Sequence, residues 1–112
     1  MRWKIIYYNE KLEKEIFKLP DTLLARFIRM TEVMQEFGPN IGMPHTRTMG
    51  DGLFELRLKG KEGISRIFYC TLVRNNICLL HSIIKKTQKT PHKDLQLAQF
   101  RMKEVKNGKK NT

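Results

Sequence analysis

The 112-residue sequence predicts a single α+β domain, with a helical hairpin on one face of a mainly antiparallel sheet and a C-terminal helix. Two patterns support this fold class. Residues 53–59 alternate apolar and charged side chains, and β-branched and aromatic runs at 64–73 and 77–84 follow after short turns, as in successive antiparallel strands. Residues 10–37 instead repeat apolar side chains every three or four positions, which is the spacing of amphipathic helices. With a first strand ahead of the helices, the expected order is β-α-α-β-β-β-α.

The first third of the chain predicts one strand and two helices. Residues 2–8 form an aromatic and β-branched run, which is typical of a strand. Two apolar stripes at 10–19 and 22–37 predict helices separated by a break at Pro20, and a Gly-Pro pair ends the second helix. Because the two helices are close in sequence, we expect them to form a hairpin packed on the sheet.

The strand predicted at residues 53–59 is expected to bury one face and expose the other. Successive side chains of a strand point to opposite faces. The apolar face would carry Phe54, Leu56 and Leu58, and the charged face would carry Glu55, Arg57 and Lys59. Since charged side chains are rarely buried, the second face should be solvated. The run at 77–84 is almost continuously apolar, which indicates a central strand covered on both faces.

Loops and turns are indicated where periodicity is absent. Residues 40–50 contain Gly and Pro and show no repeat, so they predict a loop in which His45 and Arg47 are solvated. Two glycines in residues 60–63 suit a tight turn, because glycine adopts positive φ at little cost. The Asn pair at 75–76 suits a hairpin turn for a similar reason.

The last helix is predicted over residues 91–105. Thr90 followed by Pro91 fits an N-cap and a proline in the first turn. The residues from 107 to 112 are polar and basic, so they are expected to form a flexible tail. No repeat or linker divides the chain, and we therefore expect residues 1–112 to form one domain.

Composition argues against several classes of protein. A hydrophobic content of 40% is that of a globular chain and not of a disordered one. No apolar run approaches the ~20 residues that span a bilayer, and the opening residues lack a signal-peptide core, so we expect a cytoplasmic protein. Cys70 and Cys78 lie on neighbouring predicted strands and are expected to be reduced core residues, not a disulfide or a metal site.

Basic charge is concentrated in the second half of the chain. Of the formal net charge of +11, residues 1–50 contribute +2 and residues 51–112 contribute +9. Such an asymmetry indicates an anionic partner, and nucleic acid is the partner that it most directly suggests.

Three segments follow one another in the second half of the chain, namely Gly52-Leu-Phe-Glu-Leu-Arg57, Ser65-Arg-Ile-Phe-Tyr69 and the run from Leu79 to Pro91. In this order they resemble the RelE/ParE superfamily of toxins, and most closely its HigB-like, phage-derived branch. The basic ending of the third segment, Lys-Lys-Thr-Gln-Lys-Thr-Pro, is the most specific part, and Ile84 precedes it where the family pattern has Phe. The motif similarity covers about residues 52–105, and the element order matches over almost the whole chain.

This resemblance implies the toxin of a type II toxin–antitoxin system. It implies a ribosome-dependent endoribonuclease that cleaves mRNA and inhibits translation, and that acts as a monomer or is held by a cognate antitoxin, often a helix-turn-helix protein, in a hetero-oligomer. No membrane partner is implied. The alternatives are a gyrase poison of the ParE type and a basic nucleic-acid-binding module without catalytic activity.

RNA can be cleaved without a metal when its own 2′-hydroxyl attacks the adjacent phosphorus. The protein must then take a proton from that hydroxyl, stabilise charge on the phosphorane and protonate the leaving oxygen. Arg and Lys suit the second task, because their donors match phosphate oxygens. The carboxylates of the second half show no compact ligand spacing, so we expect neither a metal nor another cofactor.

The resemblance also implies roles for particular residues. Arg57 and Arg66 match basic strand positions of the family and would bind phosphate and stabilise transition-state charge. Lys86, in the basic pair after the last strand, would join them. His92 stands where RelE has a Tyr near the chain end, and imidazole is a competent acid or base near neutral pH. The other cations expected to contact RNA or the ribosome are Lys59, Lys61, Lys85, Lys89 and Lys93.

Several of these side chains also fit a purely structural role. Arg57 could form a surface ion pair across strands, and His92 could be an exposed helix residue. His81 lies in an apolar run and is expected to be a core histidine with a satisfied hydrogen bond. Tyr69 is expected in the core, although it could stack on a base. Glu55 is expected to be a poor base, because cations surround it.

Overall fold

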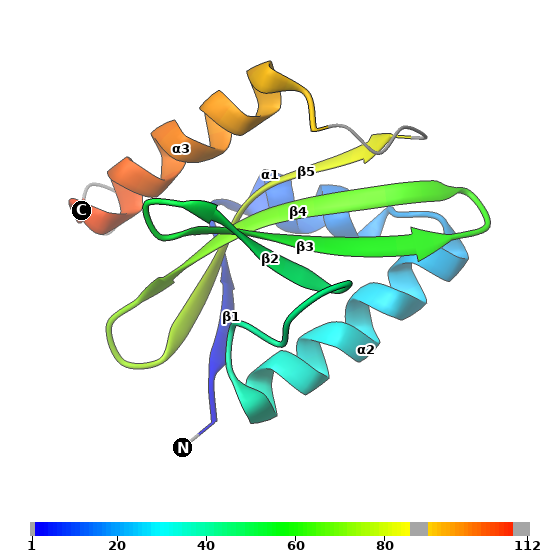
Figure 1. The fold of residues 1–112 in the computed structure, drawn as a ribbon, viewed down its shortest axis with the longest axis horizontal. Helices are drawn as coiled ribbons and strands as arrows, with labels where there is room; N and C mark the ends of the chain where they lie inside the picture. The colour runs from blue at the N-terminus through cyan, green and yellow to red at the C-terminus, as the bar shows by residue number, and fades with distance from the viewer. Residues whose placement is uncertain (1, 86–89, 109–112) are drawn as a thin grey trace.

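The computed structural model describes residues 2–85 and 90–108 of the chain (Figure 1). In chain order, its elements are β1 (Lys4–Tyr7), α1 (Glu10–Phe17), α2 (Asp21–Phe37), β2 (Thr46–Gly50), β3 (Leu53–Gly60), β4 (Gly63–Leu72), β5 (Asn76–Lys85) and α3 (His92–Lys106). The predicted α+β class is confirmed. No helix within the described residues is long and apolar enough to cross a bilayer.

A five-stranded sheet forms the middle layer of the molecule. Its strand order is β1-β5-β4-β3-β2; β1 runs parallel to β5, and every other neighbouring pair is antiparallel. The helical hairpin of α1 and α2 covers one face of the sheet and α3 covers the other (Figure 1). The predicted antiparallel-rich sheet, with its hairpin on one face and a C-terminal helix, is therefore confirmed.

The apolar core is divided by the sheet into two parts. The part under α1 and α2 comprises Leu12, Ile16, Leu19, Leu23, Phe27, Met34, Leu56, Leu58, Ile67, Tyr69, Ile77 and Leu79. The part under α3 comprises Leu53, Phe68, Cys70, Cys78, Leu80, Ala98, Met102 and Val105. Each large apolar side chain that is fully buried stabilises the fold by about 1.5–3 kcal/mol. Because β5 contributes to both parts, the prediction of a strand covered on both faces is confirmed, and both cysteines are buried as thiols.

Residues 46–50 form an edge strand, so the loop predicted for residues 40–50 is wrong in its second half. This strand, β2, pairs with β3 by aligning Thr46 with Leu56 and Arg47 with Glu55. Its residues are mostly polar and exposed, and only Thr46 is buried. An edge strand is held by hydrogen bonds to a single neighbouring strand and can form without alternating apolar side chains. A search for apolar periodicity therefore does not detect it.

The charged face of β3 is not solvated, which corrects a second expectation. Glu55 is 1% exposed and Arg57 is half-buried, while Lys59 alone of the three is exposed. Arg47, Arg66 and Thr90 cover the Glu55 carboxylate and supply it with hydrogen bonds. Charged side chains can be buried when they are paired in this way.

The start of α3 also differs from the prediction. The residue that caps the helix is Pro91, in an extended conformation and without a side-chain cap hydrogen bond, and the helix begins at His92. Thr90 does not act as the N-cap, because its hydroxyl donates to Glu55 on β3. The segment before α3 is therefore anchored to the sheet by a tertiary contact.

Candidate functional site

Two arginines lie opposite each other on the central strands. Arg57 of β3 aligns with Arg66 of β4 in the antiparallel ladder, so their side chains leave the same face of the sheet. Arg66 is almost fully buried, with only 1% of its surface exposed. Its Nη1 lies 3.3 Å from Oε1 of Glu55, which sits on the same face of β3 two residues before Arg57.

Glu55 accepts hydrogen bonds from three other segments of the chain. The Nε of Arg47, on β2, lies 3.1 Å from Oε1, the oxygen that also faces Arg66. The Oγ1 of Thr90, before α3, donates to Oε2 over 2.8 Å. Both oxygens are thus engaged, and a carboxylate in this state orients the side chains that donate to it.

A small cavity of about 210 Å³ opens above these groups. It is lined by Met43, Pro44, His45, Thr46, Arg47, Glu55, Arg57 and Arg66. Three guanidinium groups and an imidazole therefore line one cavity, together with a single carboxylate. Guanidinium groups bind the oxygens of a phosphate in a bidentate manner, so the cavity has the chemistry of a phosphate site.

The beginning of α3 is held against the sheet by a second polar contact. The Nε2 of His81, on β5, lies 2.7 Å from Oδ1 of Asp94 in the first turn of α3. The His81 ring stacks on Phe68 at a centroid distance of 6.3 Å. His81 is therefore half-buried with a satisfied hydrogen bond, close to its predicted role. Together with the bond from Thr90 to Glu55, this contact anchors the chain on both sides of His92, which lies two residues after Thr90 and two before Asp94 and is exposed.

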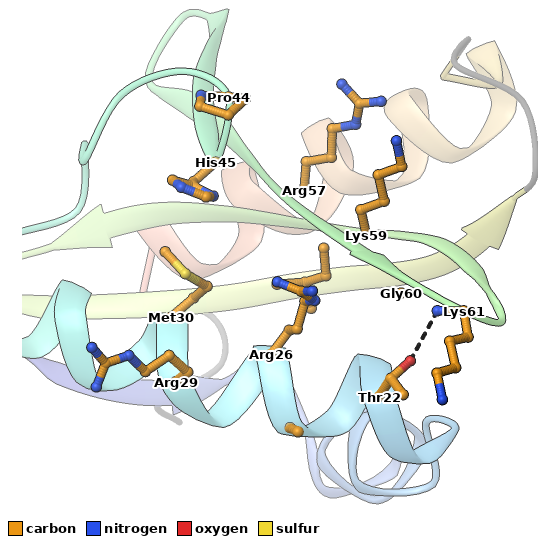
Figure 2. Close-up of a pocket in the computed structure, with 12 residues that line it drawn as sticks. Thr22, Arg26, Arg29, Met30, Pro44, His45, Arg57, Lys59, Gly60 and Lys61 are labelled. Carbon is orange, nitrogen blue, oxygen red and sulfur yellow. Dashed lines mark hydrogen bonds between the residues drawn. The ribbon is translucent and has the colours of Figure 1, made fainter.

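A larger cleft of about 910 Å³ lies between α2 and the outer edge of β3 (Figure 2). Its lining is rich in basic side chains, namely Arg26, Arg29, His45, Arg57, Lys59 and Lys61. The rest of the lining is Thr22, Ala25, Met30, Pro44, Leu58 and Gly60, so no acidic residue of the described chain lines it. Pro44, His45 and Arg57 line both the cleft and the small cavity, so the two hollows are neighbours.

The structure brings together some of the predicted site residues. Arg57 and Arg66 line the small cavity, and Lys59 and Lys61 line the cleft. His92 and Lys93 are exposed at the start of α3. The backbone of Lys85 ends β5, and its side chain, like the whole of Lys86 and Lys89, lies outside the described residues.

Tyr69 is part of the core, as expected. It is fully buried between β4 and the helical hairpin, and its hydroxyl donates to the backbone carbonyl of Pro39. Burial raises the pKa of the Tyr69 hydroxyl well above its ordinary value, while a hydrogen bond with Thr46 acts in the opposite direction. This phenol is therefore unavailable for stacking on a base.

Several residues of the site escape sequence reasoning. Arg26 and Arg29 lie off the apolar stripe of α2, where charge is the rule on any solvated helix face. His45 and Arg47 lie in a segment without periodicity, and Arg47 reaches the site only because β2 pairs with β3. The sequence pattern predicts that the Thr90 hydroxyl caps its own helix, whereas in the structure this hydroxyl donates to Glu55 on β3. In residues 2–85 and 90–108, the His, Cys, Asp and Glu side chains form no group of three that could hold a metal ion.

Comparison with known proteins places the chain in a family. A comparison with curated proteins finds none that matches this chain significantly. Among solved structures, the chain is similar to a chain of the archaeal RelE–RelB complex from Pyrococcus horikoshii OT3, with a TM-score of 0.55 and 16% identity over 80% of this chain and 100% of that one. At this identity the likeness shows a shared RelE fold. The profile of the phage-derived Gp49-like proteins (DUF891) matches residues 14–103. The chain therefore belongs to the phage-derived Gp49-like family, a HigB-like branch of the proteins with the RelE fold.

Proposed function

We propose that this protein is the toxin of a type II toxin–antitoxin system and acts in the cytoplasm as a metal-independent endoribonuclease, cleaving mRNA on the translating ribosome. The observation that carries the proposal is the small cavity in which Glu55 holds the guanidinium of Arg66, with Arg57 and Arg47 beside it. Preorganised cations in a water-poor site stabilise developing charge far better than mobile surface cations do.

The reaction proposed for this cavity is an internal transfer of a phosphodiester. A base removes the proton of the ribose 2′-hydroxyl, and the 2′-oxygen forms a bond to the adjacent phosphorus. The bond from phosphorus to the 5′-oxygen of the next nucleotide then breaks, and an acid supplies a proton to that oxygen. The products are a 2′,3′-cyclic phosphate and a 5′-hydroxyl, and the reaction consumes no external oxidant, reductant or metal.

Roles for the side chains follow from their positions. Arg57 and Arg66 would bind the non-bridging oxygens of the phosphorane. Lys86 would be a third cation that contacts these oxygens. We assign proton transfer to one of two imidazoles, that of His92, which is exposed two residues after Thr90 in the chain, or that of His45, which lines the cavity. Glu55 would orient Arg66 and would not act as the base, since three donors already engage its oxygens.

A protein partner fits this proposal. The archaeal RelE structure was solved as a complex with RelB, and we propose that this chain also has a cognate antitoxin, as a monomer alone and in a hetero-oligomer when inhibited. The formal net charge of +11 would favour both ribosome and antitoxin association through electrostatic attraction.

The decisive experiment is primer extension on mRNA after induction of the protein. New cuts should appear in translated transcripts, and they should be absent from the same transcript with its start codon destroyed. Arg57→Gln should abolish the cuts, whereas Lys11→Gln, which removes an exposed charge on α1, should leave them unchanged.

A growth assay and a cleavage assay in the presence of a metal chelator complete the test. Expression alone should arrest growth, and co-expression of the antitoxin should restore it. Cleavage in a purified translation reaction should persist in EDTA at a concentration that leaves the ribosome intact. Unimpaired growth with abundant soluble protein would contradict the toxin assignment, and DNA damage without cuts in mRNA would indicate gyrase poisoning.

A further inference from the structure

The cleft between α2 and β3 has two cationic walls that belong to different parts of the chain. Arg26 and Arg29 line the cleft from α2, and Arg57 and Lys59 of β3 line it from the other side with Lys61 of the following turn. In Figure 2, Arg26 extends from α2 toward β3, Arg29 lies along the helix, and the Arg57 and Lys59 side chains rise from β3 away from α2. Arg26 and Arg29 are exposed, and neither forms an ion pair with another residue of the described chain. Their charge is therefore available to an external anion.

The surface between these walls is largely apolar. Ala25 and Met30 contribute to it from α2, Leu58 from β3, and Pro44 from the turn before β2. A floor of this kind with cations along its rim matches a single nucleic-acid strand, because bases pack on apolar and aromatic surfaces while phosphates contact Arg and Lys. A peptide made of acidic residues alone would use the cations but would leave the apolar floor without a matching partner.

The two sides of the cleft meet at Thr22 and Lys61, which both line it. The backbone N–H of Lys61 donates to Oγ1 of Thr22 over 3.0 Å, so α2 touches the turn after β3. The approach is close enough that a Cβ on Gly60 would lie 2.4 Å from the same oxygen. Glu62 accepts a hydrogen bond from Thr22 there and adds a negative charge beyond the cationic walls. Elsewhere along its length the cleft adjoins the small cavity, with which it shares His45 and Arg57.

We propose that this cleft binds the stretch of single-stranded RNA that flanks the phosphate being cleaved, with Arg26 and Arg29 as phosphate-binding residues of the α2 wall. The RNA strand would enter the small cavity at His45 and lie with its bases on the apolar floor. The identity of the ligand as substrate RNA rests on the proposed function. Arg26 and Arg29 would set how tightly RNA is held and take no part in the chemical step.

The test measures RNA binding directly, without cleavage. The full chain is titrated into a short, unstructured RNA oligonucleotide with a fluorescent label, and fluorescence anisotropy is followed at several salt concentrations. The variant is Arg26→Glu/Arg29→Glu, with Arg26→Gln/Arg29→Gln as a milder version. The matched control is Lys4→Glu/Lys11→Glu, which makes the same change of charge at exposed positions on β1 and α1, near the opposite edge of the sheet. Thermal melting verifies that all variants are folded.

The expected result is that Arg26→Glu/Arg29→Glu raises the Kd for RNA at least roughly tenfold, beyond any rise in the control, because two charge-assisted contacts are lost. For the milder variant, the slope of log Kd against log salt concentration should fall by about 1.4, since each phosphate contact contributes ~0.7 for a single strand. A Kd equal to that of the control would overturn the proposal. So would a normal Kd combined with lost binding to ribosomes, which would assign the arginines to ribosomal RNA.

Two further arms separate this proposal from its alternatives. If polyglutamate displaces the RNA as efficiently as unlabelled RNA does, the cleft recognises negative charge alone and the assignment to RNA is overturned. A translation-coupled cleavage assay with the same proteins separates the RNA-binding role of the cleft from the proposed nuclease activity.

If Arg26→Glu/Arg29→Glu weakens RNA binding but the wild-type protein never cleaves mRNA, the RNA-binding role of the cleft stands and the nuclease activity is refuted. If Arg26→Glu/Arg29→Glu cleaves mRNA and binds RNA normally, the role of the cleft is refuted and the nuclease activity stands.

Discussion

Glu55 and Arg66 form an ion pair that is almost completely excluded from water. Arg66 Nη1 lies 3.3 Å from Glu55 Oε1, and the two side chains are 1% and 2% exposed, with Glu55 the more deeply buried. A buried pair of this kind contributes little net stability relative to apolar residues, because both charges have lost their hydration. Breaking it from one side is costly, however, since the remaining charge stays buried without its partner. The pair therefore couples the proposed phosphate site to the stability of the sheet.

Arg66→Met should lower the free energy of unfolding by about 3–5 kcal/mol, because it leaves the Glu55 carboxylate buried with fewer donors. The double variant Glu55→Met/Arg66→Met should recover a large part of this loss without recovering cleavage. Urea denaturation measures both effects. Arg29→Met, at an exposed position, serves as the control and should stay within about 0.5 kcal/mol of the wild type. A wild-type midpoint for Arg66→Met would contradict the burial of the pair.

Thr90→Val should reduce the rate of cleavage by about tenfold or more, because small displacements of catalytic groups have large effects on rate. Valine has the shape of threonine but cannot donate to Glu55, so the start of α3 and the adjacent His92 lose an anchor. Thr90→Ser keeps the hydroxyl and should retain most of the activity. Single-turnover cleavage on ribosomes and RNA binding by anisotropy are measured in parallel. Equal rates for the Val and Ser variants would show that the hydrogen bond does not position the site.

His92→Gln should lower the single-turnover rate by about 10²-fold or more and change RNA binding by less than about threefold, if this imidazole transfers a proton. Lys93→Gln, at the next position of the same helix turn, should show the opposite pattern, because an exposed lysine contributes through attraction to phosphate. A large loss of rate in His45→Gln together with a normal rate in His92→Gln would assign the proton transfer to His45.

The free energy of unfolding should decline as the pH rises above about 9. Burial raises the pKa of the Cys70 thiol from 9.0 to about 11, although nearby Lys106 acts in the opposite direction. Between these values the unfolded chain binds fewer protons than the folded one, so stability is lost with increasing pH. Burial raises the pKa of Tyr69 as well, which adds to the decline.

Urea midpoints at pH 8, 9 and 10 measure this decline, and Cys70→Ala should reduce it. The same burial should make both cysteines unreactive toward an aromatic disulfide reagent at pH 8 until urea is added. Rapid labelling of the native protein would contradict the buried, protonated state of Cys70.

Local patterns are enough to predict most elements of the fold. The apolar spacing in α2 and the alternation in β3 each reflect one face packed against a core, which is a property of neighbouring residues. The order of three motifs, together with the concentration of basic residues after residue 50, also predicts the family to which the chain belongs. The same motifs contain Arg57 and Arg66, so the sequence alone is enough to select these two arginines as candidates.

The tertiary structure alone decided which polar groups meet. Strand register brings Arg47 and Arg66 to Glu55, and the packing of α3 brings Thr90 to the same carboxylate. Because α2 packs close to β3, Arg26 lines one side of a cleft between them. These contacts join residues far apart in the sequence, and each depends on geometry that no local periodicity encodes. An apolar stripe reports that a surface is covered, whereas the partner of a charge is known only once the covering segment is in place.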